Sequence, residues 1–239
     1  MNQTISVNKN GVLMIAHRGL SGLERENTCA AFVAAGNRSY YGIETDIHRT
    51  ADGEYVVFHD DTTERLAKVN WVVEEKTLCE LRSLTLKDTD GVSRGDLVLP
   101  TLEEYIRICK KYEKTAVLEL KNPFCQKDIQ EVVARIGQEG WLERTVFISF
   151  DIGNMITLRQ LLPQQQLQFL FYELTEEIVD KLLQYQLDAD IKYTNVTSDV
   201  VEKLHSLGKK VNVWTVDDPK TAELLAQMGV DFITSNILE

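Results

Sequence analysis

Short apolar segments recur along the chain, and segments with the spacing of amphipathic helices lie between them. Each apolar segment is four to six residues long, which is typical of a buried strand and too short for most helices. The pattern predicts eight strands, at residues 12–16, 42–47, 115–120, 145–149, 167–172, 188–192, 211–215 and 231–234.

The intervening segments carry the signals of helices and of helix ends. One apolar stripe has the i, i+3, i+4, i+7 spacing of a helix face and consists of Ile129, Val132, Val133 and Ile136. Ser198 is expected to cap a helix that ends before Gly208. Asp218-Pro219 should begin another helix, and Gly229 should end it.

A repeated order of strand and helix predicts an α/β fold with parallel strands and right-handed crossovers. Eight strands suit a closed TIM (β/α)8 barrel better than an open doubly wound sheet, because no GxGxxG or P-loop follows the first strand. We expect one domain over residues 1–239, with a small insertion at about 55–100, after the second strand and on the catalytic face. No helix is expected after the last strand, so that edge should be exposed or used for contact.

Charge and composition restrict the possible partners and location. The chain has 26 basic and 37 acidic residues, and no basic cluster exceeds a pair, so binding of nucleic acid is not expected. An acidic protein that binds an anion needs local positive charge, which favours a bound metal. The polar segment Met1–Gly11 lacks the pattern of a secretory signal, and no apolar run has transmembrane length. We therefore expect a cytoplasmic protein without membrane insertion; a homo-oligomer is compatible with the sequence.

Two strands are predicted to end in carboxylates that share a face. Glu44 and Asp46 are two residues apart and should point to the same side of the second strand. Glu119 and Lys121 have the same relation at the end of the third. Converging carboxylates repel unless a cation compensates, and hard oxygen ligands favour Mg²⁺, Ca²⁺ or Mn²⁺ over zinc. Solvated acids and a salt-bridged Glu119–Lys121 pair are the alternative interpretations.

Two histidines are candidates for proton transfer. The first strand ends in His17-Arg18-Gly19, and His59-Asp60 follows a short apolar run in the insertion. With a pKa near ~6.5, one imidazole can start as a base and the other as an acid. A capping His17 with a surface arginine is the alternative interpretation.

The remaining candidates are weaker. His48 continues the spacing of Glu44 and Asp46, but we expect the strand to end before it and His48 to lie in a loop. His205 should be a surface or capping residue. Trp214 could pack in the barrel or form a wall against the substrate, and Phe150 is a similar case.

Together these motifs resemble the ordered signature of glycerophosphodiester phosphodiesterases, from about Met14 to Ser235. The matching segments are His17-Arg18-Gly19, Glu26-Asn27-Thr28, Glu44-x-Asp46, His59-Asp60, Leu99-Pro100-Thr101-Leu102-Glu103-Glu104, Glu119-x-Lys121 and Val213-Trp214-Thr215-Val216. Arg25 and Ser235 depart from the pattern, because the family often has proline and aspartate at these positions.

The resemblance implies a TIM barrel, a divalent cation, and hydrolysis of a small glycerophosphodiester to sn-glycerol 3-phosphate and an alcohol. It makes His17 and His59 the general acid/base pair. It implies that Arg18 and Lys121 contact the phosphate and that Glu26 and Asn27 shape the same rim. The metal ligands that it implies are Glu44, Asp46 and Glu119.

Three other activities remain open. A lysophospholipase D or a phospholipase C-like enzyme would share the histidine pair, but no amphipathic membrane helix or exposed aromatic loop is obvious in the sequence. A barrel that binds a phosphodiester without cleaving it should lack part of the acid/base or metal set, and this chain has all of it.

Overall fold

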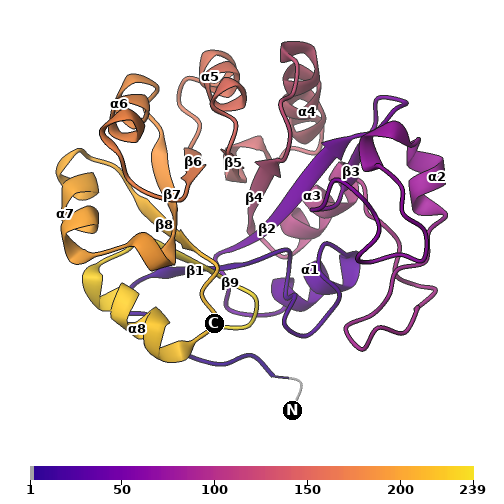
Figure 1. Cartoon of the computed structure of the whole chain (residues 1–239), viewed down its shortest axis with the longest axis horizontal. Coiled ribbons are helices and arrows are strands. Elements are labelled where there is room, and N and C mark those ends of the chain that lie inside the picture. Colours follow the sequence, from indigo (N-terminus) through magenta and orange to yellow (C-terminus); the bar gives the residue numbers. More distant parts are fainter. Residues whose placement is uncertain (1–2) are drawn as a thin grey trace.

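A computed structural model describes residues 3–239, so the first two residues of the predicted domain and of the segment Met1–Gly11 lie outside the described residues. Within that range eight parallel strands form a barrel and helices surround it (Figure 1). The barrel strands are β1 (Leu13–Ala16), β2 (Gly42–Arg49), β4 (Thr115–Leu120), β5 (Thr145–Ser149), β6 (Leu167–Phe171), β7 (Asp188–Lys192), β8 (Val211–Trp214) and β9 (Phe232–Ser235). Because β1 pairs in parallel with both β2 and β9, the sheet is closed, as the sequence predicted.

An α-helix packs between each pair of successive barrel strands in the described chain, and the segment between β2 and β4 has one more, which belongs to the insertion described below. These helices are α1 (Cys29–Gly36), α3 (Leu102–Lys111), α4 (Gln126–Gln138), α5 (Ile152–Leu161), α6 (Glu176–Gln184), α7 (Ser198–Ser206) and α8 (Pro219–Met228). Two short 3-10 helices, η2 (Leu142–Arg144) and η3 (Tyr193–Asn195), join them to the barrel. None of the helices between residues 3 and 239 is long and apolar enough to cross a membrane.

The predicted strand boundaries are correct at β4, β5 and β7 and differ by one or two residues elsewhere. The largest difference is at β2, which continues to Arg49 instead of ending at residue 47. The reason is a tertiary contact, because the end of β2 pairs with the antiparallel strand β3 (Tyr55–Val57). This pairing supplies backbone partners that an isolated strand end would lack.

The helix ends agree with the sequence except at α7. Asp218 caps α8 by accepting a hydrogen bond from the Thr221 amide, and Gly229 ends it in the left-handed conformation with φ of 88°. For α7 the predicted cap is wrong, because Thr197 accepts from the amide of residue 200 and Ser198 is the first helical residue. Both residues can cap, so the sequence alone does not separate them.

The insertion has a small apolar core of its own. It contains β3, the 3-10 helix η1 (Val73–Glu75) and α2 (Leu78–Arg82), and it lies beside the end of β2 (Figure 1). Its buried side chains are Val56, Phe58, Leu66, Ala67, Val73, Leu81, Leu84, Leu86, Leu97 and Leu99. This packing gives a fixed support to His59, which directly follows the buried Phe58.

The edge expected to be open is not open in the described structure. Besides the pairing of β1 with β9, residues 5–7 pair with residues 237–239 through the Ile5 amide and Ile237 carbonyl (3.1 Å) and the Glu239 amide and Ile5 carbonyl (2.9 Å). Leu238 is fully buried in the main core. The prediction of an exposed edge is therefore wrong, because extended chain takes the place of a helix there.

Candidate active site

The chain turns sharply after β1 and brings two predicted site residues to the carboxyl end of the barrel. Arg18 and Gly19 both have positive φ, 53° and 74°. A Cβ on Gly19 would lie 2.7 Å from the Cβ of Ala31, so only glycine fits this approach. The Arg18 amide donates to Glu44 Oε2 at 2.7 Å, which fixes the turn against β2. This explains the sequence His-Arg-Gly at this place.

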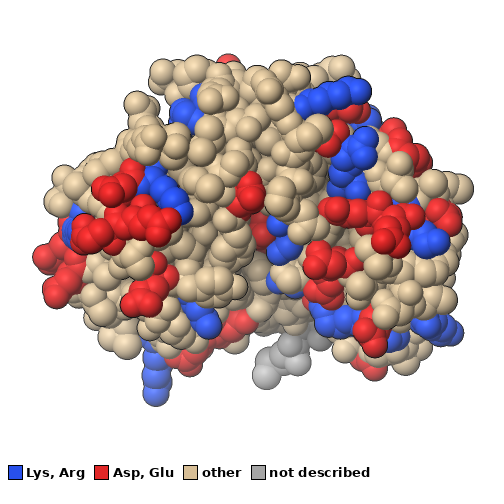
Figure 2. All heavy atoms as spheres, turned by 45° about the horizontal axis from the view of Figure 1, so that its top comes forward, with Lys and Arg blue, Asp and Glu red and all other residues tan. Residues whose placement is uncertain are grey.

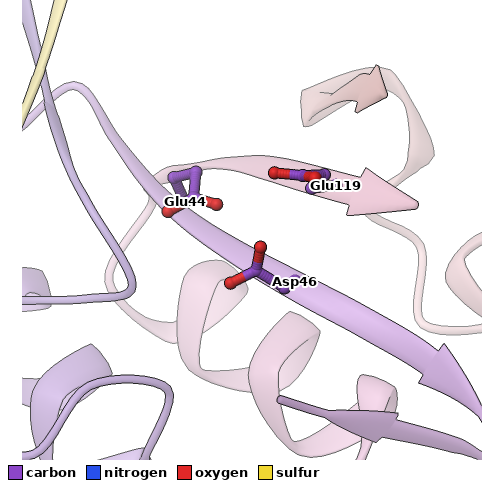
Figure 3. Close-up of side chains that lie close together, drawn as sticks. All are labelled: Glu44, Asp46 and Glu119. Carbon is purple, nitrogen blue, oxygen red and sulfur yellow. The ribbon is translucent and has the colours of Figure 1, made fainter. Parts of the chain in front are cut away.

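Glu44, Asp46 and Glu119 converge on one point, as Figure 3 shows. The first two project from β2 and the third from the neighbouring β4, where Asp46 and Glu119 are register partners. One oxygen from each lies within 4.8 Å of the others, and the side chains are 7% exposed or less. The alternation of side chains along a strand accounts for this convergence.

The electrostatics of these carboxylates fit a cation. Burial and the charge of Asp46 raise the pKa of Glu44 well above its ordinary value and that of Glu119 to about 7. Burial would also raise the pKa of Asp46, but Arg18 and Lys121 lower it to about 2. Asp46 Oδ1 and Glu119 Oε1 are buried, and both face the Lys121 ammonium, at 3.6 and 3.0 Å. Convergent carboxylate oxygens are the donor set that Mg²⁺, Ca²⁺ or Mn²⁺ takes.

Two cationic side chains stand beside the carboxylates. Arg18 Nε lies 3.7 Å from Asp46 Oδ2, and Lys121 Nζ lies 3.0 Å from Glu119 Oε1 and 3.6 Å from Asp46 Oδ1. Both cations also line the cavity described below. An anion beside the carboxylates would therefore meet positive charge on two sides.

Glu26 and Asn27 hold these groups and do not line the cavity. Asn27 is 2% exposed and donates to Asp46 Oδ2 at 2.8 Å. Glu26 accepts from Arg18 Nη1 at 2.8 Å and from both terminal nitrogens of Arg65 at 2.7 and 2.8 Å. Burial would raise the pKa of Glu26, but the hydrogen bonds and charges of the two arginines lower it to about 2. Both residues act on the site through their partners.

His17 is held by an amide. Its Nδ1 lies 2.7 Å from Asn236 Oδ1. Asn236 is oriented in turn, because its Nδ2 donates to Asp217 Oδ2 at 2.6 Å and its Oδ1 accepts from the Ser21 hydroxyl at 2.6 Å. An amide oxygen only accepts, so Nδ1 of His17 carries the proton and Nε2 has the free lone pair. Burial and the Arg18 charge lower the pKa of His17 to about 4.

His59 is held by a carboxylate instead. Its Nδ1 lies 2.7 Å from Asp60 Oδ1, and Arg65 Nε donates to Asp60 Oδ2 at 2.7 Å. Burial lowers the pKa of His59, as do the charges of Arg18 and Lys121, and the charge of Asp46 and the hydrogen bond with Asp60 oppose this effect. The two histidines thus differ in the charge of the group behind them.

A cavity of about 330 Å³ contains most of these groups. The strands from β1 to β4 and the insertion give it a charged side, formed by His17, Arg18, Glu44, His59, Glu119 and Lys121. The strands from β5 to β9 give it a largely apolar side with one carboxyl group, formed by Ile148, Phe150, Leu170, Tyr172, Asp190, Trp214, Thr215 and Thr234. The cavity can therefore receive a molecule that is anionic at one end and less polar at the other.

Three aromatic side chains pack together on the apolar side. Phe150 and Tyr172 stack with centroids 5.4 Å apart, and Trp214 meets both edge-on at 5.6 Å. The indole Nε1 donates to the backbone oxygen of Asp190 at 3.3 Å, which fixes the ring. Both interpretations of Trp214 are thus partly right, because it packs against neighbours and also lines the cavity.

A larger hollow of about 680 Å³ lies elsewhere, at the amino-terminal ends of β4 and β5. Its lining contains no histidine, and its one carboxylate is Glu143. The chemistry therefore favours the smaller cavity. Figure 2 shows basic side chains scattered among acidic ones on the visible face, without the continuous basic patch typical of nucleic-acid binding.

The arrangement matches one protein family. The sequence model of the glycerophosphoryl diester phosphodiesterase family matches residues 17–238. The chain belongs to this family.

YhdW of Bacillus subtilis is 31% identical over 230 residues, or 93% of each chain. A glycerophosphodiester phosphodiesterase of Caldanaerobacter subterraneus is 29% identical over 227 residues, which cover 94% of this chain and 93% of that protein. A solved phosphodiesterase of Oleispira antarctica, in complex with the product sn-glycerol-3-phosphate, is 25% identical with a TM-score of 0.82 over 97% of this chain and 96% of that one.

The two departures from the family pattern have local partners in this phosphodiesterase. Arg25 Nε donates to the Lys87 carbonyl at 2.5 Å and its Nη2 to the Asp88 carbonyl, so it ties the turn after β1 to the insertion. Ser235 donates to Asp217 Oδ1 at 2.9 Å. Asp217 also orients Asn236, whose Nδ2 donates to Asp217 Oδ2 at 2.6 Å.

One weaker prediction is wrong and another is confirmed. His48 lies within β2 instead of a loop, because pairing with β3 extends the strand. It is fully buried, with Nδ1 3.1 Å from Glu74 Oε1 and Nε2 3.3 Å from the His59 carbonyl. His205 is a half-exposed residue of α7 whose Nε2 lies 2.9 Å from Asp231 Oδ2, as expected for a surface histidine.

Sequence reasoning missed several residues of the site. Asp190 had a usable signal, since Asp188-x-Asp190 has the same spacing as Glu44-x-Asp46 at a predicted strand. Tyr172 also stood at the end of a predicted strand. Asp217 and Asn236 had no signal, because their contact with each other and with His17 depends on loop conformation.

Proposed function

We propose that this protein hydrolyses glycerophosphodiesters to sn-glycerol 3-phosphate and an alcohol. The observation that carries the proposal is the presence, in one cavity, of a carboxylate cluster, two tethered histidines and two cationic side chains. Cleavage of a phosphodiester uses each of these, because the negative charge of the phosphate must be neutralised, the nucleophile must lose a proton and the departing oxygen must gain one. The Oleispira antarctica relative in complex with sn-glycerol-3-phosphate supports the same product.

We propose Glu44, Asp46 and Glu119 as the ligands of one divalent cation, Mg²⁺, Ca²⁺ or Mn²⁺. The convergent oxygens and the raised pKa values of Glu44 and Glu119 support this assignment. A divalent cation bound there supplies charge neutralisation for the phosphoryl oxygens. Arg18 and Lys121, which flank the carboxylates, would bind the same phosphate.

The hydrogen bonds behind the histidines support different roles. His17, with a protonated Nδ1 and a low pKa, has a free Nε2 lone pair at neutral pH and suits the general base. It would remove a proton from water or from the neighbouring glycerol hydroxyl. His59, backed by the Asp60 carboxylate, is better able to carry a second proton and suits the general acid. It would protonate the departing oxygen.

The supporting residues have less direct roles in this proposal. Glu26 would hold Arg18, and Asn27 would hold Asp46, through the hydrogen bonds described above. Trp214 would form a wall of the substrate site. The single-domain organisation with an insertion at 55–100, the cytoplasmic location and a homo-oligomer stay predictions.

A specific observation favours a second substrate class. The sequence suggested no exposed aromatic loop, but Phe150 is 37% and Tyr172 58% exposed beside the cavity. An exposed aromatic surface next to an apolar wall could receive an acyl chain. Lysophospholipids, whose cleavage would make the enzyme a lysophospholipase D, are therefore the second candidate.

One experiment tests the reaction, the metal and the substrate class together. Release of glycerol 3-phosphate would be measured from glycerophosphocholine, glycerophosphoethanolamine and glycerophosphoglycerol. Release of choline from lysophosphatidylcholine, which leaves lysophosphatidic acid, would be measured in parallel. Activity should disappear in excess EDTA and return with Mg²⁺, Ca²⁺ or Mn²⁺ better than with zinc. Full turnover by protein shown to be metal-free would contradict the metal assignment, and cleavage of lysophosphatidylcholine alone would favour the second candidate.

A further inference from the structure

Asp190 is a buried acid in the active-site cavity that the proposed reaction does not use. It projects from β7, lines the cavity and is 2% exposed. Its Oδ1 has no hydrogen-bond partner among the described residues. Buried polar oxygens in folded proteins are nearly always paired, so an unpaired one in a binding cavity points to a partner on the ligand.

The other polar side chains of this layer are satisfied by one another. Asn212 on β8 donates through Nδ2 to Gln168 Oε1 on β6 at 3.0 Å. Thr234 on β9 donates through its hydroxyl to Asn212 Oδ1 at 3.2 Å. Burial raises the pKa of Asp190 well above its ordinary value, and a hydrogen bond from Asn212 to the carboxyl group opposes this. Oδ1 of Asp190 itself has no partner among the described residues.

Asp190 is also separate from the proposed metal site. In the described chain, the oxygens that lie within 4.8 Å of one another belong to Glu44, Asp46 and Glu119 alone. The strand β7 is separated from β4 by β5 and β6. Arg18, Lys121 and Asp190 nevertheless line the same cavity, so a phosphodiester held by the two cations has room to place one ester arm beside Asp190.

We propose that Asp190 accepts a hydrogen bond from a hydroxyl of the substrate's glycerol arm and so selects polyol phosphodiesters over those with apolar arms. This inference rests on the proposed function, because it concerns the same cavity. A carboxyl oxygen accepts from a hydroxyl in either protonation state, so the contact does not depend on the charge of Asp190. An apolar arm would leave the buried oxygen unpaired, and such sites discriminate strongly against analogues that lack the hydroxyl.

The test compares glyceryl p-nitrophenyl phosphate with propyl p-nitrophenyl phosphate, which share a leaving group and differ only in the hydroxyls. The parent protein should prefer the glyceryl ester in kcat/KM by roughly tenfold or more. Asp190→Leu should remove most of this preference by slowing only the glyceryl ester. Asp190→Asn retains an acceptor and should keep most of it.

Asp188→Asn is the matched control. Asp188 lies on the same strand two residues before Asp190 but does not line the cavity, and its Oδ1 accepts from the Lys210 amide, so this change should leave the preference for the glyceryl ester unchanged. A parent without preference, or equal losses on both esters with Asp190→Leu, would overturn the proposal. The proposal would also be overturned if Asp190→Leu slowed cleavage of glycerophosphoethanolamine but not of glycerophosphoethanol. That result would indicate that Asp190 binds the ammonium group of the substrate.

Two further measurements keep the proposal open to refutation. If thermal denaturation shows that Asp190→Leu does not fold, Asp190→Ala takes its place. If neither variant folds, the parent alone still tests the proposal, because it must prefer the glyceryl ester over the propyl ester. If the parent cleaves neither ester, the proposed function fails. The Asp190 contact is then tested by calorimetry. The parent should bind sn-glycerol 3-phosphate more tightly than propyl phosphate, and Asp190→Leu should bind the two equally. Equal affinities of the parent for the two ligands would refute the Asp190 contact.

Discussion

Replacing Asp60 by asparagine should slow cleavage of an alkoxide leaving group about fivefold to tenfold and leave release of p-nitrophenolate nearly unchanged. Asp60 Oδ1 lies 2.7 Å from His59 Nδ1. Burial would raise the pKa of Asp60, but the hydrogen bonds from Arg65 and His59 lower it to about 2, so it is ionised at neutral pH. Asparagine keeps an acceptor for Nδ1 but removes the charge that stabilises a protonated His59.

The magnitude follows from the kind of hydrogen bond that is lost. A charge-assisted hydrogen bond contributes ~1.5–3 kcal/mol and a neutral one ~0.5–1.5 kcal/mol, a difference of ~1–1.5 kcal/mol. The side chains of His59 and Asp60 are 30% and 26% exposed, so solvent reduces the effect to about 1 kcal/mol. Since ~1.4 kcal/mol is tenfold in rate, the expected loss is about fivefold to tenfold.

The assay compares kcat for glycerophosphoethanolamine with kcat for glyceryl p-nitrophenyl phosphate. An alkoxide needs a proton to depart and p-nitrophenolate does not, so a general acid matters only for the first. Asp61→Asn is the control, because its carboxylate accepts from Asn122 at 3.2 Å and not from His59. Equal losses on both substrates, or the same loss with Asp61→Asn, would refute the assignment of His59 as the acid.

Four further predictions follow from the site. Alanine at any one of the three proposed metal ligands should weaken binding of Mg²⁺ or Ca²⁺ in calorimetry while the circular dichroism spectrum stays parental; unchanged affinity would exclude that residue as a ligand. His17→Ala should lower kcat by at least about 10²-fold with a smaller change in KM, and a near-parental kcat on glycerophosphoethanolamine would contradict its role. Asn236→Leu should lower kcat and, in ¹⁵N NMR of the imidazoles, mix the two tautomers of His17; a pure Nδ1–H form would show that Asn236 does not set the tautomer. In EDTA the parent should lose thermal stability relative to Glu119→Gln as the pH rises from about 4.5 to about 7, because Glu119 keeps its proton longer in the folded state, whereas the lowered pKa of His17 gives an opposite slope in both proteins; the same pH dependence of Tm in the two proteins would contradict it.

The barrel and the carboxylate cluster could be predicted because they follow from local periodicity. A strand places residues i and i+2 on one face, and neighbouring parallel strands end at the same rim. Glu44 and Asp46 therefore share a face, and Glu119 joins them from the adjacent strand once eight strands close a barrel. The same rule would have found Asp190, had it been applied to the strand at 188–192.

The groups that orient the histidines could not be predicted, because they depend on loops that meet only in the folded chain. Asn236 is 219 residues from His17, and no periodicity relates them. Arg65 reaches Glu26 across 39 residues because the insertion folds on its own apolar core. The burial of His48 likewise results from pairing with β3, which no pattern within β2 reveals.

The charges of the site argue for one divalent cation more strongly than any single contact. Four carboxylates, those of Glu26, Asp46, Asp60 and Glu119, form hydrogen bonds or ion pairs with three cationic side chains, Arg18, Arg65 and Lys121. A fifth, Glu44, accepts only from the Arg18 backbone amide. Two negative charges remain uncompensated. Without a cation, burial and the excess negative charge raise the pKa values of the buried carboxyl groups Glu44 and Glu119. A single divalent cation would bring this group of side chains, Arg18 and Lys121 included, to neutrality. An anionic phosphodiester would then meet no net negative charge at the site, although the chain as a whole carries a net charge of −11.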